Sequence, residues 1–185
     1  MEENRLFIAI DLPDVVKEEL ERICRYCKKR KLFVGRCTRP ENFHLTLKFL
    51  GSVSEDVLPQ VDELLQNIVA SPCKAMLGHL GIFPHRRLMR VLYAELFSAP
   101  LEVLAKQIEQ SLAGICEPED REFKNHVTIA RIKKVENKGF FLREVEGFAV
   151  KPLEFEINEF LLMCSDLLPE GPVYTTLARY RLHER

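Results

Sequence analysis

Apolar and polar residues alternate in two short stretches of the chain, residues 43–50 and 123–132. Alternation with a period of two is typical of a β-strand that has one buried face. Side chains two positions apart on a strand point to the same side of the sheet. Each stretch is therefore expected to pack its aliphatic residues into the core and to present its other side chains on the opposite face.

The elements around these two stretches follow the same order in both halves of the chain. In the first half, residues 5–10 predict a strand and residues 15–31 an amphipathic helix, with Asp14 as its N-cap. In the second half, residues 90–96 predict a strand and residues 101–112 a helix. A connector then leads to the alternating stretch in each half. The order strand, helix, connector, strand therefore indicates an internal repeat.

The fold class that follows is α+β, with two pseudo-symmetric lobes. Each lobe is expected to be a mainly antiparallel sheet with helices on the outside, and the active site is expected in the central cleft between the sheets. Residues 1–185 are predicted to form one two-lobed domain, with the repeat at about residues 5–51 and 90–132. The other predicted elements are helices at 54–70 and 140–146 and strands at 77–83, 155–164 and 174–182.

Composition and charge narrow the range of functions. The formal net charge is only −1 at pH 7, which argues against wrapping of a long nucleic acid but not against binding of one end. The acidic N-terminal residues do not resemble a signal peptide. No apolar run approaches the roughly 20 residues of a membrane-spanning helix. We expect a soluble cytoplasmic protein that acts as a monomer, away from membranes.

The six cysteines are scattered, and only Cys24 and Cys27 lie close together. A zinc site would need a second pair or nearby histidines, which the other cysteines do not provide. Free thiols in a cytosolic chain are usually small core residues or surface thiols. We therefore expect no metal ion and no other cofactor.

The two alternating stretches contain one four-residue pattern twice, as His44-Leu45-Thr46-Leu47 and His126-Val127-Thr128-Ile129. Each copy places an imidazole beside a hydroxyl on the face that is not buried. In-line displacement at phosphorus needs a base on the attacking side and an acid on the leaving side. Histidine can take either role near neutral pH, and threonine hydroxyls can donate to the non-bridging oxygens. The duplicated pattern therefore predicts metal-independent phosphate chemistry.

With their flanking residues, both motifs resemble those of the two-histidine phosphoesterases, and within them the RNA 2′,3′-cyclic phosphodiesterases, once called 2′-5′ RNA ligases. The likeness extends to residues 5–13, 81–84 and 171–174. The tryptophan often found before Pro40 is missing, since the chain has none. The resemblance implies that water opens a 2′,3′-cyclic phosphate at an RNA 3′ end, or on a small cyclic nucleotide, and leaves a 2′-phosphate.

The resemblance also implies roles for the motif residues. His44 would be the general acid that protonates the departing 3′ oxygen, and His126 the base that activates water, although the near identity of the halves leaves this polarity open. Thr46 and Thr128 would hold the phosphate, together with Arg131.

Phe49 would stack on the terminal base, although it can also be a core residue. Strict alternation turns Phe49 and Arg131 away from the histidines, so we expect a bulge or a strand end to redirect them. The same alternation places Lys48 beside His44, where it would attract phosphate. Tyr174 fits either the border of the cleft or the core.

Two other functions fit the same sequence. One is 2′-5′ ligation of RNA halves. For ligation, both RNA ends must be held together in the cleft, because water at roughly 55 M competes for the cyclic phosphate. The other is an RNA- or nucleotide-binding module that no longer turns over. The arginines at positions 86, 87 and 90 fit either an RNA entrance or, more commonly, solvated turn charges.

Overall fold

The computed structural model describes residues 3–86, 88–118, 122–169 and 171–184. The strands are β1 (Glu3–Asp11), β2 (Val34–Cys37), β3 (His44–Ser54), β4 (Cys73–His85), β5 (Leu88–Phe97), β6 (His126–Lys134), β7 (Glu154–Ile157), β8 (Glu159–Leu168) and β9 (Gly171–Arg181). The helices are α1 (Asp14–Lys29), α2 (Leu58–Gln66), α3 (Ala99–Ser111) and α4 (Lys138–Glu146), and a 3₁₀ turn, Pro40–Asn42, precedes β3.

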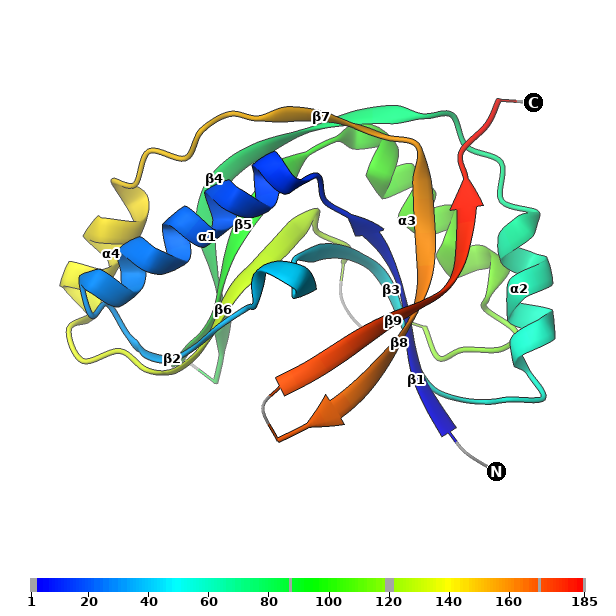
Figure 1. The fold of residues 1–185 in the computed structure, drawn as a ribbon, viewed down its shortest axis with the longest axis horizontal. Helices are drawn as coiled ribbons and strands as arrows, with labels where there is room; N and C mark the ends of the chain where they lie inside the picture. Colours follow the sequence, from blue (N-terminus) through cyan, green and yellow to red (C-terminus); the bar gives the residue numbers. More distant parts are fainter. Residues whose placement is uncertain (1–2, 87, 119–121, 170, 185) are drawn as a thin grey trace.

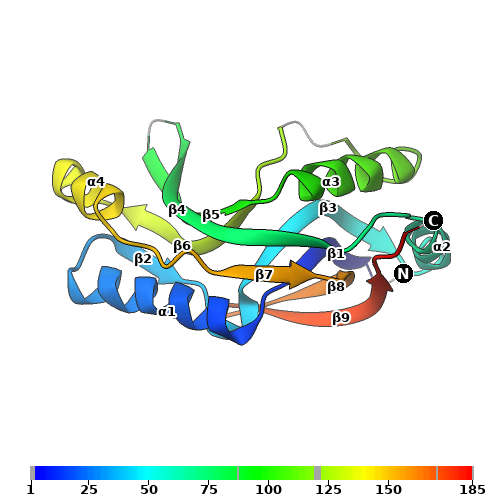
Figure 2. The same cartoon turned by 90° about the horizontal axis from the view of Figure 1, so that it is seen from above.

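The strands form one strongly curved sheet (Figures 1 and 2), in the order β7-β4-β5-β6-β3-β1-β8-β9, with β2 beside β6. The two halves of the sheet meet at β3 and β6, where Leu45 and Val127 are the paired residues. In each half, the strand before the helix pairs antiparallel with the histidine strand, β1 with β3 and β5 with β6. The predicted α+β fold of two pseudo-symmetric, mainly antiparallel lobes is confirmed.

The helices cover the face of the sheet that carries the aliphatic motif residues. Each long helix packs across the centre onto the other half: α1 contacts β6, and α3 contacts β3. The aliphatic residues at the second and fourth motif positions are buried there, as the alternation predicts: Leu45, Leu47, Val127 and Ile129. Burial of each such side chain contributes about 1.5–3 kcal/mol relative to exposure. This core holds both histidine strands in place on the face of the sheet opposite the histidines.

Four of the predicted elements differ from the structure. The connector before Pro40 contains β2, which the sequence pattern did not reveal, and β2 pairs with β6. The predicted strand at 155–164 is two strands, because the chain changes direction near Asn158: β7 pairs with β4, and β8 with β1.

The other two differences concern helix starts. The helix expected from residue 54 begins at Leu58, because β3 continues to Ser54 through Gly51, whose φ is +74°. At the start of α1, Pro13 occupies the N-cap position and Asp14 is the first helical residue, without a side-chain cap hydrogen bond. Among the described residues, no helix has the length and apolar character needed to cross a bilayer.

Candidate active site

The bridge between β3 and β6 lies in the middle of the two histidine motifs. Continuing its register places His44 across from Thr128, and Thr46 across from His126. All four residues are half-buried while their neighbours in the motifs are buried, so the four share one face of the sheet. The histidines are then diagonal neighbours of an antiparallel pair, which lie about 7–8 Å apart. A single phosphate group can fit between two such side chains.

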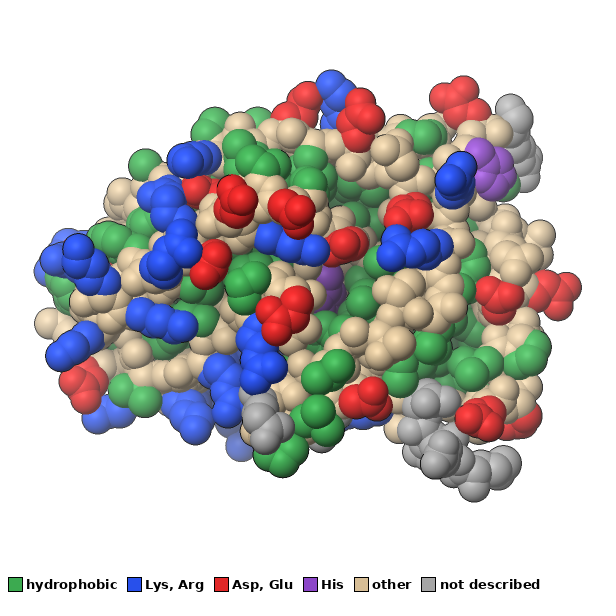
Figure 3. Space-filling model, in the orientation of Figure 1, with side chains coloured by type: hydrophobic (Ala, Val, Ile, Leu, Met, Phe, Trp, Pro, Cys, Tyr) green, Lys and Arg blue, Asp and Glu red, His purple; other side chains and the backbone are tan. Residues whose placement is uncertain are grey.

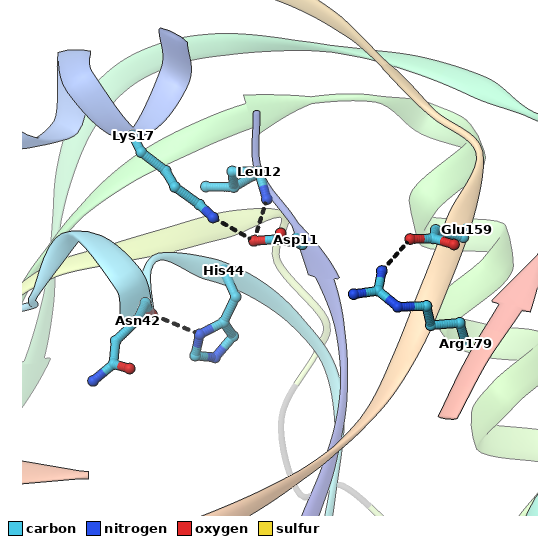
Figure 4. A network of polar contacts seen from close by, with 7 residues as sticks. All are labelled: Asp11, Leu12, Lys17, Asn42, His44, Glu159 and Arg179. Carbon is cyan, nitrogen blue, oxygen red and sulfur yellow. Dashed lines mark hydrogen bonds and ion pairs between the residues drawn. The ribbon is translucent and has the colours of Figure 1, made fainter. Parts of the chain in front are cut away.

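Both imidazoles are held in the same way. Nδ1 of His44 lies 2.8 Å from the carbonyl oxygen of Asn42, as Figure 4 shows, and Nδ1 of His126 lies 2.7 Å from the carbonyl oxygen of Lys124. A carbonyl oxygen can only accept, so Nδ1 donates in both rings. Nε2 is therefore the nitrogen available for proton exchange in each. Nε2 of His44 lies 3.0 Å from the hydroxyl oxygen of Thr46.

The electrostatic surroundings lower the pKa of both histidines. Burial is the largest cause for each, and the hydrogen bond to the carbonyl oxygen opposes it. The charges of His126 and Arg131 also lower the pKa of His44, so the three groups are close enough to interact. The two sites differ in their other neighbours: Asp11 raises the pKa of His44, whereas Lys124 lowers that of His126.

A carboxylate faces each histidine across the ladder. Asp11 on β1 pairs with His44, and Glu95 on β5 pairs with His126. Asp11 is bound by Lys17 at 2.7 Å and accepts a hydrogen bond from the backbone N–H of Leu12 (Figure 4). Neither carboxylate takes the place of the carbonyl oxygen that orients the imidazole. Asp11 acts on His44 through its charge, whereas Glu95 lies 3.7 Å from the ammonium group of Lys124.

Aromatic rings surround His44 on the open face. Its ring centroid lies 5.0 Å from that of Phe7 and 5.1 Å from that of Tyr174, which meets it edge-on. The ring of Phe49 follows, 6.3 Å from Phe7, and its side chain is 59% exposed. Tyr174 thus borders the site, and Phe49 is not a core residue.

A second aromatic group surrounds His126. The ring of Phe83 lies 4.8 Å away and that of Tyr93 5.6 Å away, and these two rings stack on each other. The ammonium group of Lys124 lies over both rings and donates to the Tyr93 hydroxyl at 2.7 Å. Gly81 leaves the room for Tyr93, because a Cβ there would lie 2.2 Å from the ring.

Of the two causes expected to redirect Phe49 and Arg131, the structure shows a bulge, which is present in both motifs at equivalent positions. The register between β1 and β3 skips Leu47, and the register between β5 and β6 skips Ile129. Before each bulge the even-numbered residues face the open side of the sheet, and beyond it the odd-numbered residues do. This change turns Phe49 and Arg131 to the histidine face. These two residues occupy matching places in the two halves.

The bulge also contradicts the prediction for Lys48. Its side chain turns into the other face and is buried, with Nζ 2.6 Å from a carboxylate oxygen of Glu109 on α3 and 3.2 Å from the carbonyl oxygen of Glu117. Lys48 therefore ties α3 to β3 and does not contribute to the face on which a phosphate would bind.

Strand β2 holds the bulge of the second motif. The backbone N–H of Thr38 donates to the carbonyl oxygen of Ile129 at 2.8 Å, and its hydroxyl donates to the carbonyl oxygen of Thr128, also at 2.8 Å. The thiol of Cys24 lies 3.6 Å from the Ile129 oxygen. Thr38 and Cys24 thus provide partners for the carbonyl oxygens at the bulge, and a buried carbonyl without a partner costs about 1–3 kcal/mol. The sequence offered no signal for this support.

The arginines around the β4–β5 turn have different surroundings. Arg86 is exposed at the turn with φ 46°, and residue 87 lies outside the described residues. Arg90 donates to the carbonyl oxygens of Ile132 and Lys133, so it supports β6. Figure 3 shows a histidine in a hollow near the middle of one face and Lys and Arg side chains gathered to one side of it.

The cysteines do not form a metal site in the described part of the chain. No cluster of three or more His, Cys, Asp and Glu side chains there is arranged to hold a metal ion. Cys24 and Cys27 lie on the buried side of α1. They are therefore core residues, one of the two environments expected for these thiols.

Comparison with known proteins gives consistent similarities. The family model of LigT-like phosphoesterases matches residues 10–93 and 95–174, and each stretch contains one histidine motif. The RNA 2′,3′-cyclic phosphodiesterase of Methanocaldococcus jannaschii is 32% identical over 177 residues, which are 95% of this chain and 99% of that protein.

Two crystal structures show the same fold over nearly the whole chain. The Thermus thermophilus protein TT0787 superposes with a TM-score of 0.79 and 30% identity, covering 97% of this chain and 98% of that chain. Escherichia coli LigT complexed with 3′-AMP superposes with a TM-score of 0.76 and 25% identity, covering 99% of this chain and 100% of that chain.

Proposed function

The chain belongs to the LigT-like phosphoesterase family, and we propose that it hydrolyses 2′,3′-cyclic phosphates at RNA 3′ ends, or on small cyclic nucleotides, to 2′-phosphates. The observation that carries this proposal is the placement of His44 and His126 across the β3–β6 bridge, with both Nε2 atoms available for proton exchange. The M. jannaschii relative is named for this activity, and LigT was crystallised with 3′-AMP, a nucleotide that bears a ribose phosphate.

In the proposed reaction, Nε2 of His126 accepts a proton from water as the water oxygen attacks phosphorus. The bond between phosphorus and the 3′ oxygen breaks, and Nε2 of His44 donates its proton to that oxygen. Asp11 and Lys124 favour this polarity, because Asp11 stabilises the protonated form of His44 and Lys124 disfavours the protonated form of His126, although the charges of His126 and Arg131 oppose protonation of His44. Solvent then returns both rings to their starting states.

The residues beside the histidines bind the phosphate. The hydroxyls of Thr46 and Thr128 lie next to the imidazoles on the shared face and donate to the non-bridging oxygens. The guanidinium of Arg131 adds charge, and its position is supported by its electrostatic effect on His44. Phe49 stacks on the terminal base, for which its exposed ring is suited.

The site needs one histidine from each half, so residues 1–185 act as one domain with an internal repeat. Side chains supply both proton transfers in this scheme, and it therefore requires no metal ion. A monomer is sufficient, because one chain contributes both histidines.

The test is to incubate the protein with RNA that ends in a 2′,3′-cyclic phosphate, with a metal chelator present, and to identify the product by ³¹P NMR. We expect a 2′-phosphate. A 3′-phosphate would contradict the proposed leaving group, and the absence of any product would refute the function and favour a binding module. Separately labelled RNA halves in the same assay distinguish ligation, since a joined product would reveal it.

A further inference from the structure

Arg36 and Arg131 lie directly across from each other on β2 and β6. Paired residues in an antiparallel ladder put their side chains on the same face. The bulge at Ile129 turns Arg131 to the histidine face, so Arg36 projects from that face as well. Cys37, the next residue of β2, points the other way and contacts Cys24 of α1, which agrees with this orientation.

The guanidinium of Arg36 lies at the start of β9, beside the turn that holds His44. One of its terminal nitrogens is 3.4 Å from the position that a Cβ atom on Gly171 would take. The carbonyl oxygen of Pro172, the next residue, accepts a hydrogen bond of 2.8 Å from the Asn42 side chain, and the Asn42 backbone in turn holds Nδ1 of His44. Two hydrogen bonds, from Asn42 to Pro172 and from His44 to Asn42, therefore connect the segment beside Arg36 to His44.

Two arginines in a directly opposed pair concentrate positive charge on the histidine face, which favours binding of an anion there. The planar fork of arginine matches the oxygens of a phosphate. In an RNA substrate, the nearest anion after the terminal cyclic phosphate is the phosphodiester that precedes the terminal nucleotide. The exposed Lys133 on β6 continues the positive charge beyond this pair.

We propose that Arg36, together with Arg131, binds the phosphodiester that precedes the terminal nucleotide, so that an RNA end is a better substrate than a free nucleoside 2′,3′-cyclic phosphate. This inference rests on the proposed function and names its substrate class. Arg131 contacts both the terminal phosphate region and this second subsite, whereas Arg36 serves the second subsite alone. Arg36 is thus a specificity residue rather than a catalytic one.

The experiment compares kcat/KM for three substrates. They are cytidine 2′,3′-cyclic phosphate, the dinucleotide of two cytidines that ends in a 2′,3′-cyclic phosphate, and the same dinucleotide with an uncharged methylphosphonate linkage. We expect the charged dinucleotide to be preferred roughly 10- to 100-fold over both others, as for hydrogen bonds to a charged group. Its log kcat/KM should also fall more steeply with log salt, by about 0.7 for one phosphate contact.

The variant Arg36→Gln should lower this preference to near one and remove the extra salt dependence, while Arg36→Lys should keep part of both because it keeps the charge. Arg25→Gln is the matched control, since Arg25 is an exposed arginine on α1 that pairs with Glu21 and covers the opposite face. Thermal unfolding of each variant verifies that it is folded.

The outcomes separate the two proposals. Equal kcat/KM for the charged and uncharged dinucleotides in the wild-type protein would overturn the second subsite and leave the hydrolytic function standing. An unchanged preference in both Arg36 variants would assign the subsite to other residues and overturn the role of Arg36. Failure to hydrolyse any of the three substrates would overturn the function and this inference together.

Discussion

His44 and His126 lie diagonally across the backbone bridge between β3 and β6, each with Nδ1 bound to the carbonyl oxygen of the residue two positions earlier. The same local hydrogen bond is thus used twice, in strands related by a pseudo-two-fold axis. It fixes the tautomer and directs both Nε2 atoms to the shared face. This symmetric orientation is what an acid and a base on opposite sides of one phosphorus require.

The pH dependence of kcat/KM should be bell-shaped, with its maximum below pH ~6.5, the ordinary pKa of histidine. One imidazole must be neutral and the other protonated, and burial lowers the pKa of both. Activity is lost at low pH as the base becomes protonated and at high pH as the acid loses its proton. Steady-state kinetics from about pH 4.5 to 9, with roughly constant ionic strength, measures both limbs. A flat profile through this range contradicts the histidine pair.

Two charge variants decide which histidine is the base. Lys124→Met removes a positive charge that lowers the pKa of His126, so that pKa should rise and move the acidic limb to higher pH. Asp11→Asn removes a negative charge that raises the pKa of His44, so the alkaline limb should move to lower pH. If Lys124→Met moved the alkaline limb and Asp11→Asn the acidic limb, His44 would be the base and His126 the acid. Histidine C2-proton NMR titrations of the same variants identify which ring titrates in each limb.

Replacing Phe49 with alanine should weaken catalysis without loss of stability. The ring is 59% exposed, so its removal leaves no cavity in the core. Loss of one base-stacking contact, worth about 1–3 kcal/mol, corresponds to a fall of roughly 5- to 150-fold in kcat/KM. Phe97→Ala is the control, because Phe97 is also an exposed phenylalanine but packs beside Gly78 and His79. A marked drop in Tm with unchanged kinetics would make Phe49 a packing residue.

Gly81→Ala should damage both stability and activity. The added methyl group would lie 2.2 Å from Cζ of Tyr93, so the ring must move, and that ring packs on His126. Overpacking of this kind costs about 1–3 kcal/mol, or roughly 2–10 °C in Tm. Gly114→Ala is the matched control, since no atom lies within 4 Å of its Cβ position. Equal Tm and kcat/KM in the two variants would show that Tyr93 does not position His126.

Lys48→Met should leave kcat/KM within about twofold of the wild type, because the Lys48 side chain points away from the histidines and is only 2% exposed. The Glu109 carboxylate that loses this ion pair is 32% exposed, so water can solvate it and stability should fall only slightly. Glu109→Met instead leaves the Lys48 charge without its carboxylate partner at 2.6 Å. We expect it to lower the free energy of unfolding, measured in urea, by about 1–3 kcal/mol. A large loss of activity in Lys48→Met would instead indicate that Lys48 contributes to phosphate binding.

The alternating pattern predicted the two central strands, their buried faces and the order of elements in the halves. It did not predict β2, because Val34-Gly35-Arg36-Cys37 lacks apolar alternation and its partner strand β6 is far away in sequence. Nor did it separate β7 from β8, since aromatic and aliphatic residues continue on both sides of Asn158. Both cases depend on tertiary pairing, which a local pattern does not contain.

The site was predictable where side chains share the regular alternation and was mispredicted where the backbone departs from it. His44 and Thr46 fell on one face as expected, but the bulge at Leu47 reversed the direction of Lys48. The conflict between alternation and the resemblance indicated a bulge or a strand end, but it did not show that the backbone departs from the alternation before Lys48. The hydrogen bonds of Thr38 that hold the equivalent bulge arise from β2 and had no sequence signal.

The most direct test of the paired histidines is kcat/KM for RNA that ends in a 2′,3′-cyclic phosphate, measured for His44→Ala, His126→Ala and the double variant. His183→Ala is the control, because His183 is exposed and has an Nδ1 contact to the carbonyl oxygen two residues earlier, at 3.2 Å, outside the site. Each single variant should lose about 10²- to 10⁴-fold, and the double variant little more, because the two groups act as a unit. Either single variant with most of its activity intact would contradict the account.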